Sequence, residues 1–156
     1  MGTRSKVGAA CCGLVIAVTA CGGGSERLTA AEYAREASRV CQRTNRAIAR
    51  VDAVALTGMP RAAQALERVV ELQRDAVAEL RDLRPPDGMR ATVERWIALL
   101  DQAADELGLA GARARAGRAL EAREFAGKAR TLLDRARDVT APIRVVSCRG
   151  PDLSTA

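Results

Sequence analysis

The amino-acid sequence predicts an all-α protein, an antiparallel up-down four-helix bundle with a short C-terminal tail pinned by a disulfide. The first observation is composition: 48% of the 156 residues are apolar but only 2% are aromatic. Alanine, leucine, arginine and glutamate recur throughout, and all four favour helix. The second is the spacing of apolar positions by three or four residues in four segments. The third is that glycine and proline separate these segments, so the helices have short links.

The first predicted helix opens at Thr29 and ends at Gly58. Thr29 and Glu32 have the capping-box spacing, in which each side chain satisfies a free backbone amide of the other residue. Apolar or small residues then recur along one helical face. They are Tyr33, Ala37, Val40, Cys41, Thr44, Ile48, Val51 and Ala55.

The second predicted helix begins at Pro60, since the first turn of a helix tolerates proline. It stops before Pro85 and Pro86, because consecutive prolines cannot continue a helix. Its buried face is expected to contain Ala62, Leu66, Val69, Val70, Gln73, Val77, Leu80 and Leu83.

Asp87 is expected to cap the third predicted helix. The glycines after Leu107 weaken the helix, so its end is expected between Leu107 and Ala116. Its buried face is expected to contain Met89, Val93, Trp96, Ile97, Leu100, Ala103, Ala104 and Leu107.

The fourth predicted helix ends at Thr140-Ala141-Pro142, and residues 143–148 form an apolar, β-prone tail. The helix is expected to bury Ala122, Phe125, Ala126, Ala129, Leu132, Leu133, Ala136 and Val139. Many of the core positions are alanine, so the helices should pack closely and leave little volume for a large ligand cavity. The four-helix domain spans residues 29–148, and residues 149–156 are expected to be disordered.

Residues 1–20 have the layout of a bacterial secretory signal. Arg4 and Lys6 give a positive start, and the 14 residues from 7 to 20 are uncharged. That run is shorter than the about 20 residues that span a bilayer as a helix.

Val18, Thr19, Ala20 and Cys21 resemble the lipobox of bacterial lipoproteins, in which an aliphatic residue and then two small residues precede a cysteine. The resemblance implies cleavage before Cys21 and attachment of diacylglycerol to its thiol. It also implies a location on the extracytoplasmic face of the cell membrane. Residues 21–28 then comprise the lipidated cysteine and a tether, which three glycines and a serine make flexible.

The chain has five cysteines, and the signal would remove Cys11 and Cys12. With Cys21 lipidated, Cys41 and Cys148 remain in an oxidising compartment and are predicted to form a disulfide. That bond closes a loop of 107 residues (148 − 41), which contributes about 4.7 kcal/mol in the chain-entropy model. The alternative is a pair of buried free thiols.

The geometry of a bundle permits this disulfide. Cys41 lies about 18 Å along the first helix, and seven extended residues after Ala141 reach about 23 Å. The fourth helix ends near the start of the first, so the tail can fold back along the first helix.

A framework of residues runs through the part of the chain after Cys21. It comprises Leu28, Thr29, Glu32, Tyr33, Ala37, Val40, Cys41, Leu83, Pro85, Pro86, Trp96 and Cys148. This framework resembles a group of small exported helical proteins and lipoproteins of actinobacteria. The resemblance implies the fold and the location, but the group has no assigned activity, so it implies no site residue.

The absence of histidine from the sequence excludes several kinds of site. A di-iron bundle needs Glu-x-x-His on two helices, and a histidine-ligated haem fails for the same reason. A zinc site is not expected with two sulfurs and no CxxC, so we expect no metal and no cofactor. No serine or cysteine has a base beside it, which predicts that the protein is not an enzyme. Export and the scarcity of aromatic residues for base stacking argue against nucleic acid.

Arg123, Arg130 and Arg137 recur every seven residues and so share a stripe on the fourth helix. One interpretation is a basic face toward anionic lipid headgroups or an acidic envelope polymer. The other is an ordinary solvated helix face.

Four acidic residues at steps of four share one side of the second helix: Glu67, Glu71, Asp75 and Glu79. Like charges at this spacing repel slightly. We therefore expect salt bridges with arginines of a neighbouring helix, for which the stripe on the fourth helix is the natural partner.

These observations predict a membrane-anchored lipoprotein whose non-catalytic helical domain is an interaction or structural module of the cell envelope. Its partners would be the membrane, through the lipid, and an envelope protein or anionic polymer. The alternative is an extracytoplasmic module that binds an anion or small ligand through the arginine-rich fourth helix.

Overall fold

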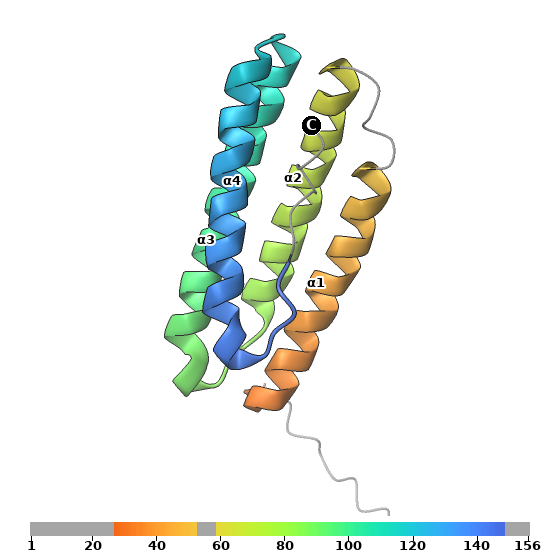
Figure 1. Ribbon diagram of the computed structural model, residues 1–156. Helices are drawn as coiled ribbons and strands as arrows, with labels where there is room; N and C mark the ends of the chain where they lie inside the picture. The colour runs from red at the N-terminus through yellow and green to blue at the C-terminus, as the bar shows by residue number, and fades with distance from the viewer. Residues whose placement is uncertain (1–26, 53–58, 149–156) are drawn as a thin grey trace, which may run out of the picture.

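The computed structural model describes residues 27–52 and 59–148, which form an antiparallel up-down bundle (Figure 1). The helices are α1 (Ala30–Asp52), α2 (Met59–Asp82), α3 (Arg90–Arg115) and α4 (Ala119–Thr140), with two 3-10 turns, η1 (Asp87–Met89) and η2 (Ala141–Ile143). α2 packs against α1 and α3, and α4 packs against α3. The predicted fold class is confirmed.

The bundle has a lower and an upper end in the view of Figure 1. At the lower end α1 and α3 begin and α2 and α4 end; at the upper end α1 and α3 end and α2 and α4 begin. The predicted signal at residues 1–20, Cys21 and its tether, the helix end at Gly58 and the tail at 149–156 lie outside the described residues.

The predicted capping box starts α1. The Thr29 backbone amide and hydroxyl both donate to Glu32 Oε2, at 2.9 and 2.7 Å. The Glu32 amide donates to Thr29 Oγ1 at 3.3 Å in return. These hydrogen bonds from Thr29 lower the pKa of the Glu32 carboxyl.

The predicted cap of α3 by Asp87 is wrong. The turn η1 stands between the prolines and α3, so Asp87 lies too early in the chain and Met89 takes the N-cap position without a side-chain hydrogen bond. The Asp87 carboxylate instead pairs with Arg90 at 2.6 Å and with Arg27.

α3 extends to the far limit of its predicted range. Gly111 does not interrupt it, because this residue is buried where α3 faces α2. The helix ends at Arg115. Two residues later Gly117 adopts a left-handed conformation with φ 72°, which costs glycine little free energy. The Gly117 amide donates to the Ala114 carbonyl at 3.0 Å and the Arg118 amide to the Arg113 carbonyl at 2.9 Å, as in a Schellman ending.

The predicted buried faces are confirmed at every described position, each of which is buried or half-buried. The largest cluster draws on all four helices and the tail, and includes Tyr33, Leu80, Trp96, Leu133 and Val145. Two smaller clusters lie above it. One contains Ile48, Val69, Val70, Leu107 and Ala129, and the other contains Ala63, Ala114 and Ala122.

The C-terminal tail folds back along α1, as its reach predicted (Figure 1). Arg144 adopts a left-handed conformation with φ 55° directly after η2, where the chain reverses. Beyond it, the Val146 amide donates to the Ser38 hydroxyl at 2.9 Å, and the Asn45 side-chain amide donates to the Ser147 carbonyl at 3.2 Å.

The disulfide joins Cys41 of α1 to Cys148 of the tail, with a Cα–Cα distance of 4.4 Å. Cys41 is 0% exposed and Cys148 3% exposed. The described part of the tail forms no strand, although its composition is β-prone, because these backbone groups bond to side chains of α1. Its apolar residues instead add Val145 and Cys148 to the largest core cluster.

Candidate interaction surface

The predicted stripe of Arg123, Arg130 and Arg137 lies exposed on α4. Arg137 pairs with Asp134 of the same helix at 2.9 Å. Asp134 comes four residues after Arg130 and three before Arg137, so this acid lies within the stripe itself. Arg123 and Arg130 have no ion-pair partner among residues 27–52 and 59–148.

Two other basic side chains, one on α3 and one on α4, pack on the ring of Phe125. Lys128 Nζ lies 4.7 Å and Arg113 Cζ 5.7 Å from the centroid of the Phe125 ring, within the range of a cation–π interaction. Lys128 also bonds Glu124 at 2.7 Å, which raises the pKa of Lys128 and lowers that of Glu124. Two of the basic residues in the range 113–137 therefore pack on Phe125, where α3 and α4 meet, and are not part of the stripe.

The acidic series of α2 pairs with arginines of neighbouring helices at two positions, as predicted, but the suggested partner, the stripe on α4, is wrong. Glu67 pairs with Arg115 of α3 and Glu79 with Arg43 of α1. Glu71 pairs with Arg68 of its own helix at 2.6 Å. The reason is topological: α2 packs against α1 and α3, whereas α4 packs chiefly against α3.

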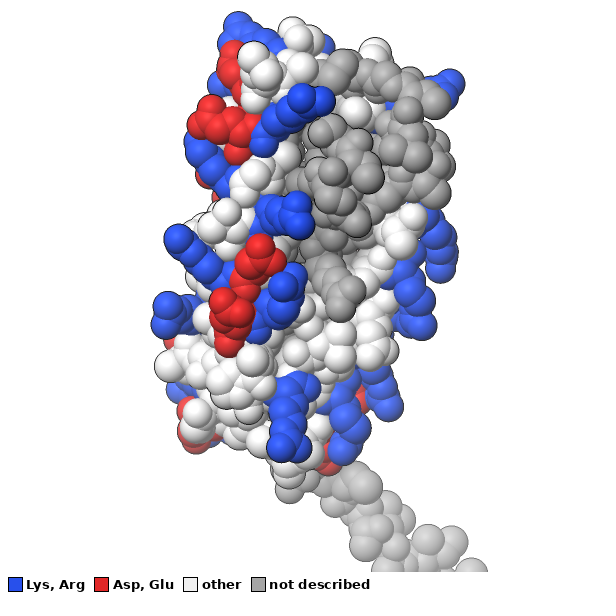
Figure 2. Space-filling view, viewed as in Figure 1, with Lys and Arg blue, Asp and Glu red and all other residues white. Residues whose placement is uncertain are grey.

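A longer basic surface, not predicted above, lies on α1. It consists of five exposed arginines, Arg35, Arg39, Arg43, Arg46 and Arg50, and is named here the α1 basic face. Their separations of four, four, three and four residues keep them on one side of the helix. Figure 2 shows basic side chains along the edge of the molecule that α1 forms in Figure 1. The spacing is visible in the sequence, but a count of charges does not reveal it, because Glu32 and Glu36 dilute the charge of the segment.

Two surface grooves run between neighbouring helices. The groove between α2 and α3, about 550 Å³, has buried Leu80, Val93 and Ile97 along its floor. Arginines at its rim are engaged by carboxylates, as in the pair of Arg81 with Asp101. The groove between α3 and α4, about 520 Å³, is lined mainly by polar and charged side chains.

Five hydroxyl groups in the described chain make structural hydrogen bonds. The Thr44, Thr131 and Thr140 hydroxyls donate to backbone carbonyls three or four residues earlier. The Ser38 hydroxyl accepts from the tail and the Thr29 hydroxyl belongs to the capping box. Across the same residues, no group of three or more cysteine, aspartate and glutamate side chains is arranged to hold a metal ion. None of the helices described here is long and apolar enough to cross a membrane.

Compared with known proteins, the chain matches no protein-family model, no curated protein and no solved structure. The resemblance to small exported actinobacterial proteins therefore stays a prediction from the sequence. Of the surfaces above, the α1 basic face carries the most arginines, five against three in the stripe on α4. Glu32 and Glu36 lie beside the α1 arginines as Asp134 lies beside those of α4.

Proposed function

We propose that the protein is a lipoprotein of the cell envelope whose non-catalytic helical domain is held at the extracytoplasmic face of the cell membrane through Cys21. The domain acts by contact with another envelope component. The observation that carries the proposal is the disulfide between Cys41 and Cys148. Such bonds form and persist in oxidising compartments, which supports the export that residues 1–20 predict.

The position of α1 supports an anchor at the lower end. Arg27 pairs with Asp87, so the chain enters the domain beside the link between α2 and α3. Residues 22–29 connect Cys21 to the first residue of α1, and eight residues extend to at most about 27 Å. An anchor at Cys21 therefore keeps the lower end of the bundle close to the membrane.

The hydrogen bonds of four hydroxyl groups support a non-catalytic role for those side chains. A serine or threonine nucleophile needs a base within hydrogen-bond reach. The Ser38 hydroxyl instead holds the tail, and Thr44, Thr131 and Thr140 bond to helix carbonyls.

Intact mass spectrometry of protein extracted from the membrane tests the anchor. We expect a chain that begins at Cys21 and carries the added mass of diacylglycerol. A chain that begins there without the lipid mass contradicts the proposal.

A pair of cysteine variants sharpens this test. Cys21→Ala should leave the membrane fraction or accumulate with its signal uncleaved, whereas Cys12→Ala should be processed and lipidated like the wild type. If both variants keep the lipid mass, the attachment is not at Cys21 and the proposal fails.

A further inference from the structure

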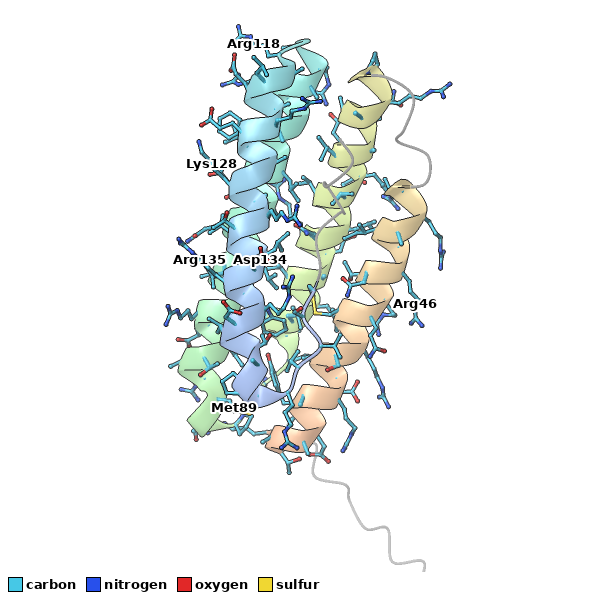
Figure 3. All side chains as sticks on the ribbon, viewed as in Figure 1. Arg46, Met89, Arg118, Lys128, Asp134 and Arg135 are labelled. Atoms are coloured by element: carbon cyan, nitrogen blue, oxygen red, sulfur yellow. A yellow bond between two sulfur atoms is a disulfide. The ribbon has the colours of Figure 1, made fainter. Side chains whose placement is uncertain are left out.

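The α1 basic face points directly away from the core. Tyr33, Ala37 and Ile48 mark the buried side of α1, and the five arginines lie on the opposite side of the helix. Figure 3 shows Arg46 directed outward from α1, on the side away from α3 and α4. At 1.5 Å per residue, the 15 steps from Arg35 to Arg50 extend this face over about 23 Å of the helix.

The upper half of this face carries charges that no described carboxylate neutralises. Arg39 pairs with Glu36 at 2.6 Å, Arg43 pairs with Glu79, and Arg35 acts on Glu32. Arg46 and Arg50 have no ion-pair partner among the described side chains of residues 27–51 and 60–148.

The paired arginines also remain accessible. The side chains of Arg39 and Arg43 are 63% and 53% exposed. Exposed pairs in water are weak, so a dense anionic surface can compete with Glu36 and Glu79 for both guanidinium groups.

We propose that the α1 basic face binds the surface of an anionic phospholipid membrane, so that the domain lies with α1 along the bilayer. The proposal rests on the proposed function, because the anchor at Cys21 would place α1 nearest to the lipid. A flat anionic surface is complementary to a straight row of arginines, and each basic residue near such a surface strengthens binding by about fivefold.

The chemistry of the face indicates contact with headgroups without insertion. Glu36, Gln42 and Ala49 lie beside the arginines on the outer side of α1, and none of them is a large apolar or aromatic side chain that enters the acyl region. Binding should therefore weaken steeply with salt, since exposed charges are screened within about 10 Å at moderate ionic strength.

Arginine footprinting tests the proposal on the full chain as it is extracted from the membrane. The protein is combined with vesicles of phosphatidylcholine, with or without phosphatidylglycerol, and treated with phenylglyoxal. Mass spectrometry then reads the modification of each arginine. We expect Arg46 and Arg50 to be protected in the vesicles that contain phosphatidylglycerol, and Arg123 and Arg130 to react equally in both. High salt should abolish the protection.

Two variants with the same change in charge provide the matched control. One carries Arg39→Glu, Arg46→Glu and Arg50→Glu on α1, and the other carries Arg123→Glu, Arg130→Glu and Arg137→Glu on α4. The α1 variant should lose the protection of Arg35 and Arg43, with binding weaker on the order of a hundredfold. The α4 variant should keep the protection of α1. Circular dichroism of both variants checks that the bundle is folded.

Several results would overturn the proposal. The α1 basic face is not selective for an anionic membrane if the arginines of α1 and α4 are protected equally, or if pure phosphatidylcholine also protects α1. The same holds if both variants lose the protection of α1 equally. Soluble polyphosphate that protects α1 as strongly as phosphatidylglycerol makes an acidic polymer the partner instead. The intact mass of the same samples reports the lipid on Cys21. If the α1 arginines are protected but Cys21 carries no lipid, only the proposed anchor is rejected. If Cys21 carries the lipid but the α1 arginines are not protected, only the membrane-binding role of the α1 basic face is rejected.

Discussion

The lower and upper ends of the bundle are held together by different side chains. At the lower end the core contains the two large aromatic residues Tyr33 and Trp96, both fully buried, together with Leu80. The tail adds Val145 and Cys148, and the disulfide ties it to α1.

The upper end is built from small residues. Its cluster consists of Ala63, Ala114 and Ala122 from α2, α3 and α4, and α1 contributes no residue to it. A Cβ added to Gly111 would lie 3.5 Å from the Leu66 Cβ, so α2 and α3 are already in close contact there. The contrast shows that α1 is held by the largest cluster and, through Ile48, by the cluster above it, and not by the small residues of the upper end. At the upper end α2, α3 and α4 pack closely against one another through these small residues.

Removal of the disulfide should have the largest effect on this comparison. The double variant Cys41→Ser and Cys148→Ser is expected to lose up to about 4.7 kcal/mol of unfolding free energy, because the 107-residue loop is no longer closed in the unfolded chain. Urea denaturation measures the loss. Hydrogen–deuterium exchange should show α1 and the tail losing protection before α2, α3 and α4. Reduction of the wild type is the control, and equal loss in all four helices would contradict the comparison.

Truncation of the lower core should come next. Trp96→Ala removes a fully buried indole and is expected to lower the unfolding free energy by about 3–5 kcal/mol, because a cavity remains. Leu109→Ala at the upper end is the control, since Leu109 is 43% exposed and should change stability by less than about 0.5 kcal/mol. Thermal unfolding followed by circular dichroism compares the two. Similar losses would show that the ends are not distinct.

Gln73 lies on α2 between the largest core cluster at the lower end and the cluster above it that contains Val69 and Val70. Its side chain is 4% exposed, and neither amide atom has a hydrogen-bond partner in the described chain. Gln73→Leu is therefore expected to raise the unfolding free energy by about 1–2 kcal/mol, since a desolvated amide is replaced by an apolar group. Gln73→Glu should destabilise by burying a charge. A loss of stability in the leucine variant would show that the amide helps to join the two regions.

Two glycines of the upper half provide the smallest test. Gly117→Ala should destabilise by about 1 kcal/mol, because φ at this position is +72° and the left-handed region disfavours a Cβ. Gly127→Ala should stabilise by up to about 1 kcal/mol, because the added Cβ meets nothing within 4 Å and alanine favours helix. Denaturant midpoints of the two variants should therefore move in opposite directions, and a shift of both in one direction would contradict the assignment.

The helices and their buried faces follow from the sequence because their causes are local. Hydrogen bonding within a helix fixes the spacing of Tyr33, Ala37 and Cys41, and the capping box of Thr29 with Glu32 needs only three residues of separation. The disulfide is predicted from the two cysteines that remain after Cys21, and the reach of residues 142–148 permits it.

Only the tertiary structure decided which charges meet. Glu67 and Glu79 pair with arginines of α3 and α1 because these helices flank α2, and no local spacing contains that information. The same holds for Asp87, which a turn separates from the cap of α3. Helical periodicity places arginines 35, 39, 43, 46 and 50 on the side of α1 opposite its predicted buried face, but only the bundle shows that these side chains stay exposed beside their neighbours. The difference is physical: backbone hydrogen bonds act over a few residues, whereas the neighbours of a helix depend on how distant apolar faces pack.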